Sequence, residues 1–399
     1  MASEILFDPS LPAFRADPYP FYRRLREVDP VHESPLGFWV LTRLTDCMMA
    51  LRDPRFDHAA MVATLDAVYG GPKEPNFIPR AMVFEDPPNH TRLRSLVNHA
   101  FTPRIVEGLR PRIHEIVGEL IDRAEPSGRM DVIGDFAYTL AVTVVSELLG
   151  VPKDDQGTVK QWSADIARSL DAIDLTTDPE VTLKGRTSRL AMAAYFRALL
   201  PERRKNPRAD LLSLLVAAEE QGDKLSEGEL LVMCILLYVA GHETSVNLIG
   251  NGLLALLRHP DQLARWRADP ALAGTAVEEL LRYTSPVARA QRVTNTDVEI
   301  DGRVIPKGAK VVVLIAAANR DPAHFTDPER LDIERRDNRH MAFGYGIHFC
   351  LGAPLARIEG HIALETLIRR LPRLALVGPE PAWRASQMFR GLEALPVTF

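Results

Sequence analysis

The most chemically distinctive stretch of the sequence is residues 343–352, FGYGIHFCLG, which places Cys350 among three glycines and shortly before Pro354. Glycines let the backbone take positive φ and approach a flat ligand closely, and proline suits the first turn of a helix. Unpaired N–H groups and the dipole at a helix N-terminus stabilise a thiolate. Such a thiolate on a glycine-rich loop is a good axial ligand for haem iron, whereas the alternative is a buried structural cysteine.

A second group of reactive side chains lies in the middle of a long predicted helix. Ser226 and Glu229 form a capping box that begins this helix, which we extend to residue 258. Gly241 costs roughly 1 kcal/mol relative to alanine inside a helix, which predicts a local distortion at a site. Three residues later, the hydroxyl of Thr244 can donate and accept a hydrogen bond. The alternative is that Thr244 bonds to its own helix backbone and that Glu243 is exposed.

Two further pairs of polar side chains are spaced so that their members share a helix face. Glu279 and Arg282 are three residues apart, and His90 and Arg94 are four apart. A surface ion pair of small energetic value is the alternative for the first pair, and a basic solvated face is the alternative for the second.

The elements that must position these residues are mainly helical. A hairpin is predicted at 31–42, a second hairpin at 298–305, and a buried strand at 310–315. We expect a long loop with at most one helical turn over 57–84, and an irregular stretch over 171–185. Helices are predicted at 19–28, 45–51, 89–99, 104–124, 131–149, 226–258 and 353–370. The pattern predicts a mostly α fold with a small β region and no linker.

Composition narrows the class of protein. The 399 residues are 46% hydrophobic and 25% charged, which is ordinary for a soluble globular protein, and the net charge of −5 gives no reason to expect nucleic-acid binding. Three cysteines far apart in the sequence predict no disulfide framework. The N-terminus lacks a signal pattern, and the most apolar run, 230–241, is too short to span a bilayer. We therefore expect a soluble, cytoplasmic protein.

The 343–352 stretch resembles the haem-ligand loop of the cytochrome P-450 family, Phe-Gly-x-Gly-x-His-x-Cys-x-Gly, at every defining position. Four other segments resemble motifs of the same family in the same order, which covers nearly the whole chain. They are DPPNHTRLR at 86–94, AGHET at 240–244, ELLR at 279–282 and ANRDP at 318–322. The resemblance implies one P-450 haem domain over residues 1–399 with haem b as its cofactor.

The resemblance also assigns roles to single residues. Cys350 would be the iron ligand, and Thr244 with Glu243 would be catalytic, carrying protons. Glu279 and Arg282 would be buried and joined by Arg330 of a later loop, in a structural role that supports the cysteine loop. The residues implied to bind the cofactor are His90, Arg94, Ala240, Gly241, Arg292, Phe343, Gly344, His348, Cys350 and Gly352.

In function, the resemblance implies a haem-thiolate monooxygenase that inserts one oxygen atom of O2 into an organic molecule by hydroxylation or epoxidation. The sequence holds no sign of a flavin or iron–sulfur module, so electrons would come from NADPH or NADH through a separate ferredoxin reductase and ferredoxin. No nucleic-acid or membrane partner is expected. Basic residues that could dock an acidic ferredoxin are Arg104, Arg112, Arg339 and Arg357, and the alternative for each is an ordinary solvated arginine.

Two other functions fit the same loop. One is a peroxide-driven enzyme of the same fold, and the other is a non-catalytic haem sensor, against which Glu243 and Thr244 argue. The resemblance places the substrate pocket wall at 57–84, 165–190, near Val239, at 287–291 and at 387–389. Much of that wall is apolar, so a lipophilic substrate of terpenoid, steroid or polyketide type is expected. Arg289 could pair with a substrate carboxylate, although solvent or a protein acid is the alternative partner.

Overall fold

The structure is a computed structural model that describes residues 7–69, 71, 78–98, 101–172, 178–220 and 225–399. Backbone packing divides the chain into two compact units. The first is built from Met1–Asp57, Arg110–Tyr138 and Thr244–Phe399, and the second from His58–Leu109 and Thr139–Glu243. The boundary falls inside the long helix α12 (Glu227–Arg258). A single haem domain over 1–399 stays a prediction.

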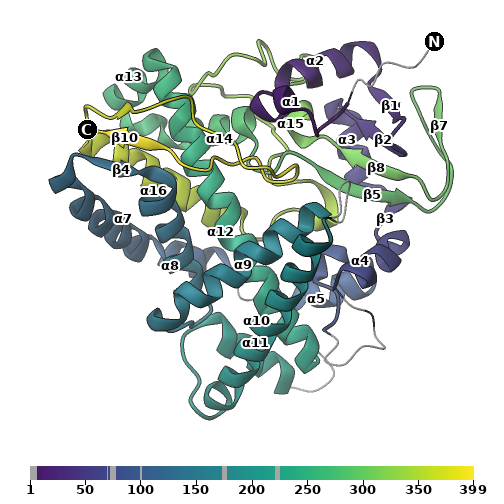
Figure 1. Ribbon diagram of the computed structural model, residues 1–399, viewed down its shortest axis with the longest axis horizontal. Coiled ribbons are helices and arrows are strands. Elements are labelled where there is room, and N and C mark those ends of the chain that lie inside the picture. The colour runs from purple at the N-terminus through teal and green to yellow at the C-terminus, as the bar shows by residue number, and fades with distance from the viewer. Residues whose placement is uncertain (1–6, 70, 72–77, 99–100, 173–177, 221–224) are drawn as a thin grey trace. The chain divides into compact units, whose positions relative to one another are not determined.

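The first unit contains a five-stranded sheet in the order β1-β2-β8-β5-β3 (Figure 1). Its strands β2 and β8 are parallel, with Val40 opposite Val312, and the other pairs are antiparallel. Gly37, with φ of +87°, makes the turn of the predicted first hairpin. The strands are β1 (Val31–Ser34), β2 (Phe38–Leu41), β3 (Phe56–Asp57), β5 (Ala290–Thr294) and β8 (Lys310–Val313). The predicted hairpin at 31–42 is confirmed, and the strand predicted at 310–315 is confirmed over Lys310–Val313, since a short helix begins at Ile315.

One face of this sheet packs into a hydrophobic core that also supports the cysteine loop. Trp39 and Leu41 of β2 and Val311 and Val313 of β8 belong to the same cluster, as the two-residue period of a strand requires. Helix α3 (Leu44–Arg52) closes the cluster, and Tyr345 of the cysteine loop packs against it. The sheet therefore positions the cysteine loop through shared core contacts.

The remaining elements of the first unit are helices and short strands. Helix α16 packs against α7 and α14. The smaller sheets are β4 (Arg129–Asp131), β10 (Pro396–Thr398) and β9 (Ala375–Leu376) in that order, and the hairpin of β6 (Val298–Ile300) and β7 (Arg303–Ile305). The helices are α1 (Pro12–Ala16), α2 (Tyr19–Val28), α7 (Arg110–Ala124), η3 (Glu125–Ser127), η4 (Val132–Ala137), α13 (Pro260–Ala268), η6 (Pro270–Leu272), α14 (Ala273–Thr284), α15 (Ile315–Ala318), η7 (Gly346–His348) and α16 (Ala353–Arg370).

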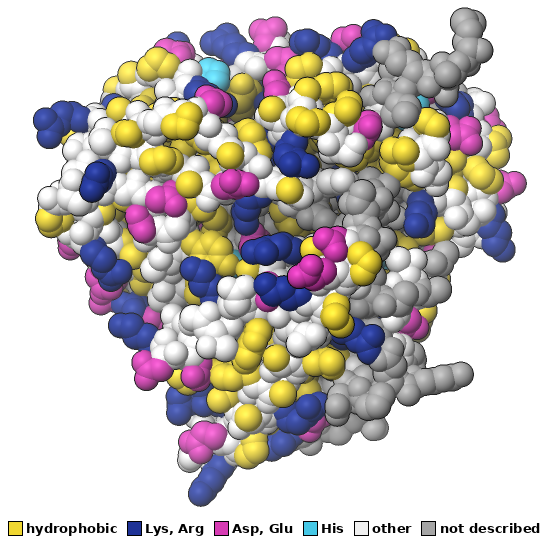
Figure 2. Space-filling view, in the orientation of Figure 1, with side chains coloured by type: hydrophobic (Ala, Val, Ile, Leu, Met, Phe, Trp, Pro, Cys, Tyr) yellow, Lys and Arg dark blue, Asp and Glu magenta, His cyan; other side chains and the backbone are white. Residues whose placement is uncertain are grey.

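The second unit is helical in the part that the structure describes. Its α9 and α10 pack so closely that a Cβ on Gly185 would lie 2.3 Å from the Cβ of Ser169. The helices are η1 (Ala59–Met61), α4 (Val62–Tyr69), η2 (Met82–Phe84), α5 (Asn89–Asn98), α6 (Pro103–Gly108), α8 (Tyr138–Leu148), η5 (Lys153–Asp155), α9 (Gln156–Ala172), α10 (Pro179–Lys205), α11 (Leu211–Glu220) and the first part of α12. Acidic, basic and hydrophobic side chains are interspersed over the face drawn in Figure 2.

The structure corrects several predicted boundaries. Two turns of helix, α4, interrupt the predicted 57–84 loop, and the helix predicted over 104–124 is broken at Leu109. The break precedes Pro111, whose ring cannot continue an existing helix but fits the first turn of α7. The helix predicted over 131–149 is wrong at its start, because Asp131 ends β4 and caps the π-helix η4 by accepting from the amides of Ile133 and Gly134.

The stretch 171–185, predicted as irregular, is largely helical where it is described. Helix α9 continues to Ala172, and α10 begins at Pro179 with Asp178 as its cap, because its carboxylate accepts from the amide of Glu180 at 2.9 Å. Gly185 therefore lies inside α10. Residues 173–177, and His99 at the end of the helix predicted over 89–99, lie outside the described residues.

The long central helix is confirmed with its predicted cap. The amide of Ser226 donates to the Glu229 carboxylate at 2.8 Å, and the amide of Glu229 donates back to the Ser226 hydroxyl at 3.3 Å. By length and composition α12, which contains the apolar run 230–241, is long and apolar enough to cross a membrane. Its apolar window is 78% buried inside the protein, as in the core helix of a soluble protein.

Candidate functional site

The cysteine loop is held in a tight backbone conformation. The amide of Cys350 donates to the carbonyl of Phe343 at 2.9 Å. Gly344 and Gly346 both have φ of +72°, which favours glycine. A Cβ on Gly346 would lie 2.4 Å from the carbonyl oxygen of Leu51 on α3, so a larger residue there would displace the loop. The glycines of this stretch therefore fix where Cys350 lies.

The three cysteines differ in exposure. Cys350 is exposed at the entrance to α16, whereas Cys47 and Cys234 are fully buried. Burial raises the pKa of both buried thiols, so they stay protonated. Helix α16 begins at Ala353 with Pro354 in its first turn, and the helix dipole therefore favours a thiolate at Cys350.

A half-buried acid stiffens the start of the loop. The Glu278 carboxylate accepts from Arg357 Nε at 2.6 Å and pairs with His340 Nε2 at 3.1 Å. Burial alone would raise the pKa of Glu278, but the hydrogen bonds from Arg357 and His340 outweigh it and lower that pKa to about 2. The Arg357 guanidinium also lies 4.5 Å from the ring centre of Phe343. Arg357, predicted to dock a ferredoxin, is thus engaged in supporting the loop.

The Glu279–Arg282 pair is completely buried, and its third member is Arg335. Arg282 donates to both carboxylate oxygens of Glu279 at 2.7 Å, and Arg335 Nε donates at 3.1 Å. The prediction of Arg330 is wrong, because its side chain is exposed and only its carbonyl oxygen accepts from Arg282, at 3.1 Å. The loop makes a further turn at Asp332 before the second arginine reaches the buried acid.

The predicted 318–322 turn joins this ion pair to the cysteine loop. The carbonyl oxygen of Asn319 accepts from Arg282 at 2.9 Å, and its side-chain oxygen accepts from the amide of Met341 at 2.8 Å. Asn319 also donates to the hydroxyl of Ser285 at 3.0 Å. The buried acid, the turn and the start of the cysteine loop are therefore one connected hydrogen-bond network.

One face of α12 is accessible although most of the helix is buried. Leu236, Ala240 and Thr244, spaced four residues apart, are half-buried or exposed, as is Gly241. The helix is continuous through Gly241, so the predicted distortion is absent from α12. A Cβ on Gly241 would lie 2.9 Å from a methyl group of Val145, which shows that close packing of α8 against α12 requires the glycine.

Glu243 is buried, which contradicts the alternative of an exposed acid. Its side chain is 6% exposed, and Oε1 lies 3.6 Å from Nε2 of the fully buried His242. The Nδ1 atom of His242 lies 2.9 Å from the carbonyl oxygen of Tyr238, one turn earlier. His242 was missed because the sequence gives no sign of which way its imidazole points.

A second buried acid, also missed from the sequence, contacts Ser245, the residue after Thr244. The hydroxyl of Ser245 donates to Oε2 of Glu359 on α16, and Glu359 is 1% exposed. Burial raises the pKa of Glu359 to about 8, and the bond from Ser245 offsets only part of this effect. Glu359 is therefore largely protonated at neutral pH. Its partner is 114 residues away, so no local pattern indicates the pair.

The predicted cationic residues belong to different parts of the chain. His90, on α5 of the second unit, is 3% exposed, and Arg94 is half-buried with Nε donating to Asn98 at 3.1 Å. Arg292, on β5 of the first unit, is 7% exposed and donates to the carbonyl of Gln291 at 2.7 Å. His348 ends η7 of the first unit and is half-buried.

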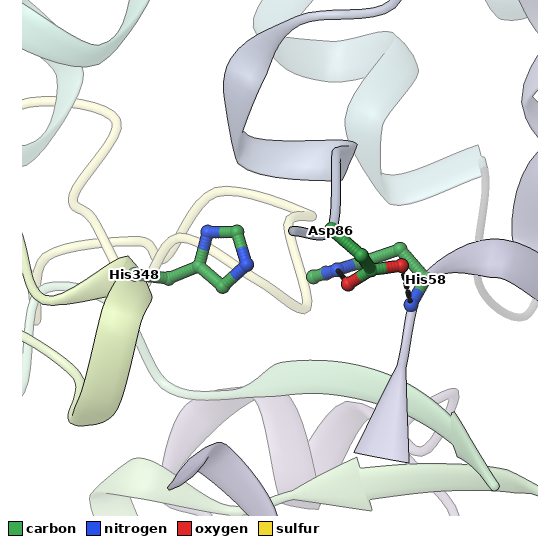
Figure 3. A group of neighbouring side chains, drawn as sticks. All are labelled: His58, Asp86 and His348. Atoms are coloured by element: carbon green, nitrogen blue, oxygen red, sulfur yellow. Dashed lines mark hydrogen bonds and ion pairs between the residues drawn. The ribbon is translucent and has the colours of Figure 1, made fainter. Parts of the chain in front are cut away.

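The segment before α5 is fixed by Asp86. Its carboxylate accepts from the amide of His58 at 2.9 Å and lies 3.3 Å from Nδ1 of the same histidine (Figure 3). The Asp86 carbonyl oxygen accepts from the amide of His90 at 3.0 Å. Asp86 thereby sets the position of the first turn of α5.

Comparison with known proteins identifies the family. The sequence pattern described as Cytochrome P450 matches residues 26–271 and 270–375. The chain is 45% identical to the cytochrome P450 monooxygenase PikC of Streptomyces venezuelae, over 96% of this chain and 91% of PikC. It is 41% identical to the polyketide biosynthesis cytochrome P450 PksS of Bacillus subtilis, over 99% of each chain. The chain belongs to the cytochrome P450 family. The predicted P-450 fold is confirmed, and this P450 is a monooxygenase whose cofactor is haem b.

A solved structure supports the same assignment. The structure of P450BioI in complex with hexadec-9Z-enoic acid ligated acyl carrier protein has a TM-score of 0.87 and 40% identity, over 97% of this chain and 99% of that one. The residues of this P450 fit haem in two respects: Cys350 is exposed on a glycine-shaped loop, and α12 carries an accessible stripe of small and apolar side chains.

Two arginines of the P450 that were predicted to contact a substrate or a ferredoxin contact other side chains of the protein. Arg289 is 3% exposed and donates to Oε1 of Gln387 at 3.2 Å. Its positive charge also lies near the buried hydroxyl of Tyr22 and opposes the increase in the pKa of Tyr22 that burial causes. Among the proposed docking residues, Arg112 pairs with Glu115 at 2.6 Å. The side chain of Arg339 is 92% exposed.

The protonated Glu359 of this P450 makes stability depend on pH. The native state keeps the Glu359 proton up to about pH 8, whereas the unfolded chain loses it near 4.5, so stability is full below 4.5 and falls as pH rises between these values. The slope is at most about 1.4 kcal/mol per pH unit. Glu359→Gln should remove this pH dependence. The unfolding free energy of the variant minus that of the parent should therefore be larger at pH 8 than at pH 5. Denaturant unfolding at both pH values measures this, with the exposed Glu119→Gln as control; equal differences at the two pH values would contradict it.

Proposed function

We propose that this P450 hydroxylates or epoxidises a lipophilic small molecule of polyketide, terpenoid or steroid type in the cytoplasm, with electrons from a separate ferredoxin and its reductase. The observation that carries the proposal is the accessible stripe of Leu236, Ala240 and Thr244 next to the buried acid Glu243. It offers apolar contact and a hydroxyl on one helix face. The name of PksS, which refers to polyketide biosynthesis, supports the substrate class.

The residues that would hold haem are those on the cysteine loop, on α5, on β5 and on α12. Cys350 would supply the thiolate, and haem with a thiolate ligand supplies the activation of dioxygen. His90, Arg94, Arg292 and His348 would give the propionates cationic or donor partners. The backbone at Phe343, Gly344, Gly352, Ala240 and Gly241 would give room for the flat macrocycle.

Glu243 and Thr244 would move protons into a pocket with poor access to water. The hydroxyl of Thr244 can accept a hydrogen bond from one donor while donating to another group. Glu243 precedes Thr244 by one residue and has a carboxylate that can exchange a proton. The pair therefore combines the Glu243 carboxylate, which can release and take up a proton, with the Thr244 hydroxyl, which can orient a proton.

Thr244→Ala is expected to reduce the product formed per NADPH consumed by on the order of tenfold, with more hydrogen peroxide released, because proton delivery loses its hydroxyl. Haem content and substrate affinity should stay close to those of the parent. Parallel assays of NADPH, product and peroxide measure this. Thr275→Ala, which removes a hydroxyl bonded to its own helix backbone, is the matched control. Unchanged coupling in Thr244→Ala would mean that protons arrive by another route.

His90→Ala and Arg94→Ala are each expected to weaken haem retention by about 1–3 kcal/mol, because each leaves a propionate short of a charge-assisted partner. The thiolate spectrum of the haem that remains should not change. Transfer of haem to apomyoglobin measures retention. Arg92→Ala is the control, since Arg92 bonds to Asn89 and Glu229. Retention equal to that of the parent in both variants would show that the propionates are held elsewhere.

Electron supply separates the proposed function from its two alternatives. Turnover with ferredoxin, reductase and NADPH, and little turnover with hydrogen peroxide, is expected for the monooxygenase. The reverse result would indicate a peroxide-driven enzyme, and absence of turnover with both would indicate a haem sensor. The ligand for this assay should come from a screen of lipophilic compounds by shifts of the Soret band.

An acyl chain held by a carrier protein is a second candidate substrate. The observation that favours it is the 40% identity to P450BioI, whose structure holds hexadec-9Z-enoic acid ligated acyl carrier protein. Titration with free hexadecenoic acid and with the carrier-bound form separates the two classes. Tighter binding of the carrier-bound form than of every free polyketide or steroid in the screen would favour this candidate.

A further inference from the structure

The segment 384–391, the C-terminal loop, folds back on itself. The amide of Arg384 donates to the carbonyl of Gly391 at 2.9 Å, so the two ends of the loop lie together. At its tip the amide of Phe389 donates to the hydroxyl of Ser386 at 2.9 Å. The loop is therefore a compact turn, and its place in the protein depends on the groups that hold it from outside.

The C-terminal loop pairs with the chain just before β5. The amide of Ala288 donates to the carbonyl of Met388 at 2.8 Å. The two segments that meet here, 287–291 and 387–389, are both predicted parts of the substrate pocket wall, and both belong to the first unit. The place of the loop therefore decides how these two parts of the predicted wall lie relative to each other.

Two asparagines of α12 hold the C-terminal loop. Asn247 is 1% exposed and Asn251 is 2% exposed, and they share one face of the helix because they are four residues apart. Oδ1 of Asn247 accepts from the guanidinium of Arg384, and Nδ2 of Asn251 donates to the carbonyl oxygen of Arg390 at 2.7 Å. The first contact requires glycine at position 391, because a Cβ on Gly391 would overlap Oδ1 of Asn247.

These contacts fix the orientation of both side-chain amides. A guanidinium can only donate and a carbonyl oxygen can only accept, so Asn247 must present its oxygen to Arg384 and Asn251 its nitrogen to Arg390. The donor Nδ2 of Asn247 and the acceptor Oδ1 of Asn251 remain. Both atoms are buried, and neither has a hydrogen-bond partner among the described residues. Buried polar atoms are satisfied by protein groups or by ordered water, so water is the partner that both atoms can share.

We propose that an ordered water molecule binds between Asn247 and Asn251, and that these two asparagines are positioning residues that set the place of 387–389 in the substrate pocket. The water accepts from Nδ2 of Asn247 and donates to Oδ1 of Asn251, because one water molecule can do both at once. The inference rests on the proposed function only in assigning 387–389 to the pocket. Both asparagines act through the loop and not on the reacting atoms.

A crystal structure of the haem-loaded P450 that resolves ordered water tests the water site. We expect a water oxygen within hydrogen-bond distance of both Nδ2 of Asn247 and Oδ1 of Asn251. A direct bond between the two side-chain amides, or a dry contact, would overturn the water site. This readout needs neither a substrate nor turnover, so it stands whatever reaction the P450 performs.

Binding of two azoles to the haem-loaded P450 tests the positioning role. Imidazole is small enough to contact little beyond the iron, whereas 4-phenylimidazole also presses a ring against the pocket wall. Asn247→Ala and Asn251→Ala should each weaken the binding of 4-phenylimidazole by on the order of fivefold, because a loop that has lost a hydrogen bond must be ordered when the ligand binds. The affinity for imidazole should stay that of the parent. Shifts of the Soret band measure both affinities.

Ser245→Ala is the matched control, because it removes a buried hydrogen bond of the same helix that is made to Glu359 and not to the C-terminal loop. It should bind both azoles as the parent does. Parent-like affinity for 4-phenylimidazole in both asparagine variants, or equal weakening of the two azoles, would overturn the positioning role. Failure of the proposed monooxygenase reaction would leave these affinities unchanged, so the two failures are distinguishable.

Discussion

Cys350→His is expected to abolish monooxygenase turnover in a protein that still folds. The exposed Cys350 on the glycine-shaped loop would hold haem as a thiolate, and the electron donation that a thiolate ligand would supply is not matched by an imidazole. The loop itself is held by the Cys350 amide and by the packing of Tyr345 and Gly346, which the substitution leaves in place. Circular dichroism and product formation measure the two outcomes.

The other two cysteines supply matched controls. Cys47 and Cys234 are 0% exposed. Cys47→Ser retains a group that can donate to the Leu41 carbonyl, as the thiol does at 3.3 Å. Turnover should therefore survive in Cys47→Ser and Cys234→Ser, although burial of a hydroxyl can cost some stability. Activity retained in Cys350→His, or lost only in the buried-cysteine variants, would disprove the assignment.

Glu279→Ala is expected to lower the unfolding free energy by about 3–5 kcal/mol, because it leaves the buried charges of Arg282 and Arg335 without their shared acid. Haem incorporation should fall as well. The same network passes through Asn319 to the amide of Met341, at the start of the cysteine loop. Denaturant unfolding and haem content per protein measure both effects.

The adjacent glutamate gives a stringent control. Glu278→Ala removes an acid that is 30% exposed and paired with Arg357 and His340, so its effect should be near 1 kcal/mol. Arg330→Ala should have little effect, because its side chain is exposed and Arg282 contacts only its backbone carbonyl. Equal losses in Glu278→Ala and Glu279→Ala would show that burial of the ion pair does not decide stability here.

Elements with strong local signals were predictable from the sequence. The capping box at Ser226 and Glu229, the hairpin with Gly37 in its turn, and the helix after Cys350 all depend on residues close in sequence. Errors arose where a proline broke a periodic pattern, as at Pro111, or where apolar residues of a short helix such as α4 lacked a clear period.

Residues of the candidate site were predictable only where they belong to a contiguous sequence motif. Cys350, Thr244 and the Glu279–Arg282 pair belong to contiguous motifs, whereas Arg335 and Glu359 reach their partners across 56 and 114 residues. The burial that raises the pKa of Glu359 depends on how α16 packs in the first unit, and no local spacing encodes it. The direction of the His242 ring is likewise set by the Tyr238 carbonyl and by packing against α9.

The central claim is that Cys350 binds haem iron as a thiolate. The most direct test is the absorption spectrum of the reduced protein with CO bound, recorded for the parent and for Cys350→His. We predict a strongly red-shifted Soret band in the parent, because thiolate ligation produces that shift in cytochromes P450, and its loss in the variant. A Soret band without that shift in the freshly prepared parent, or the red-shifted band retained in Cys350→His, would contradict the account.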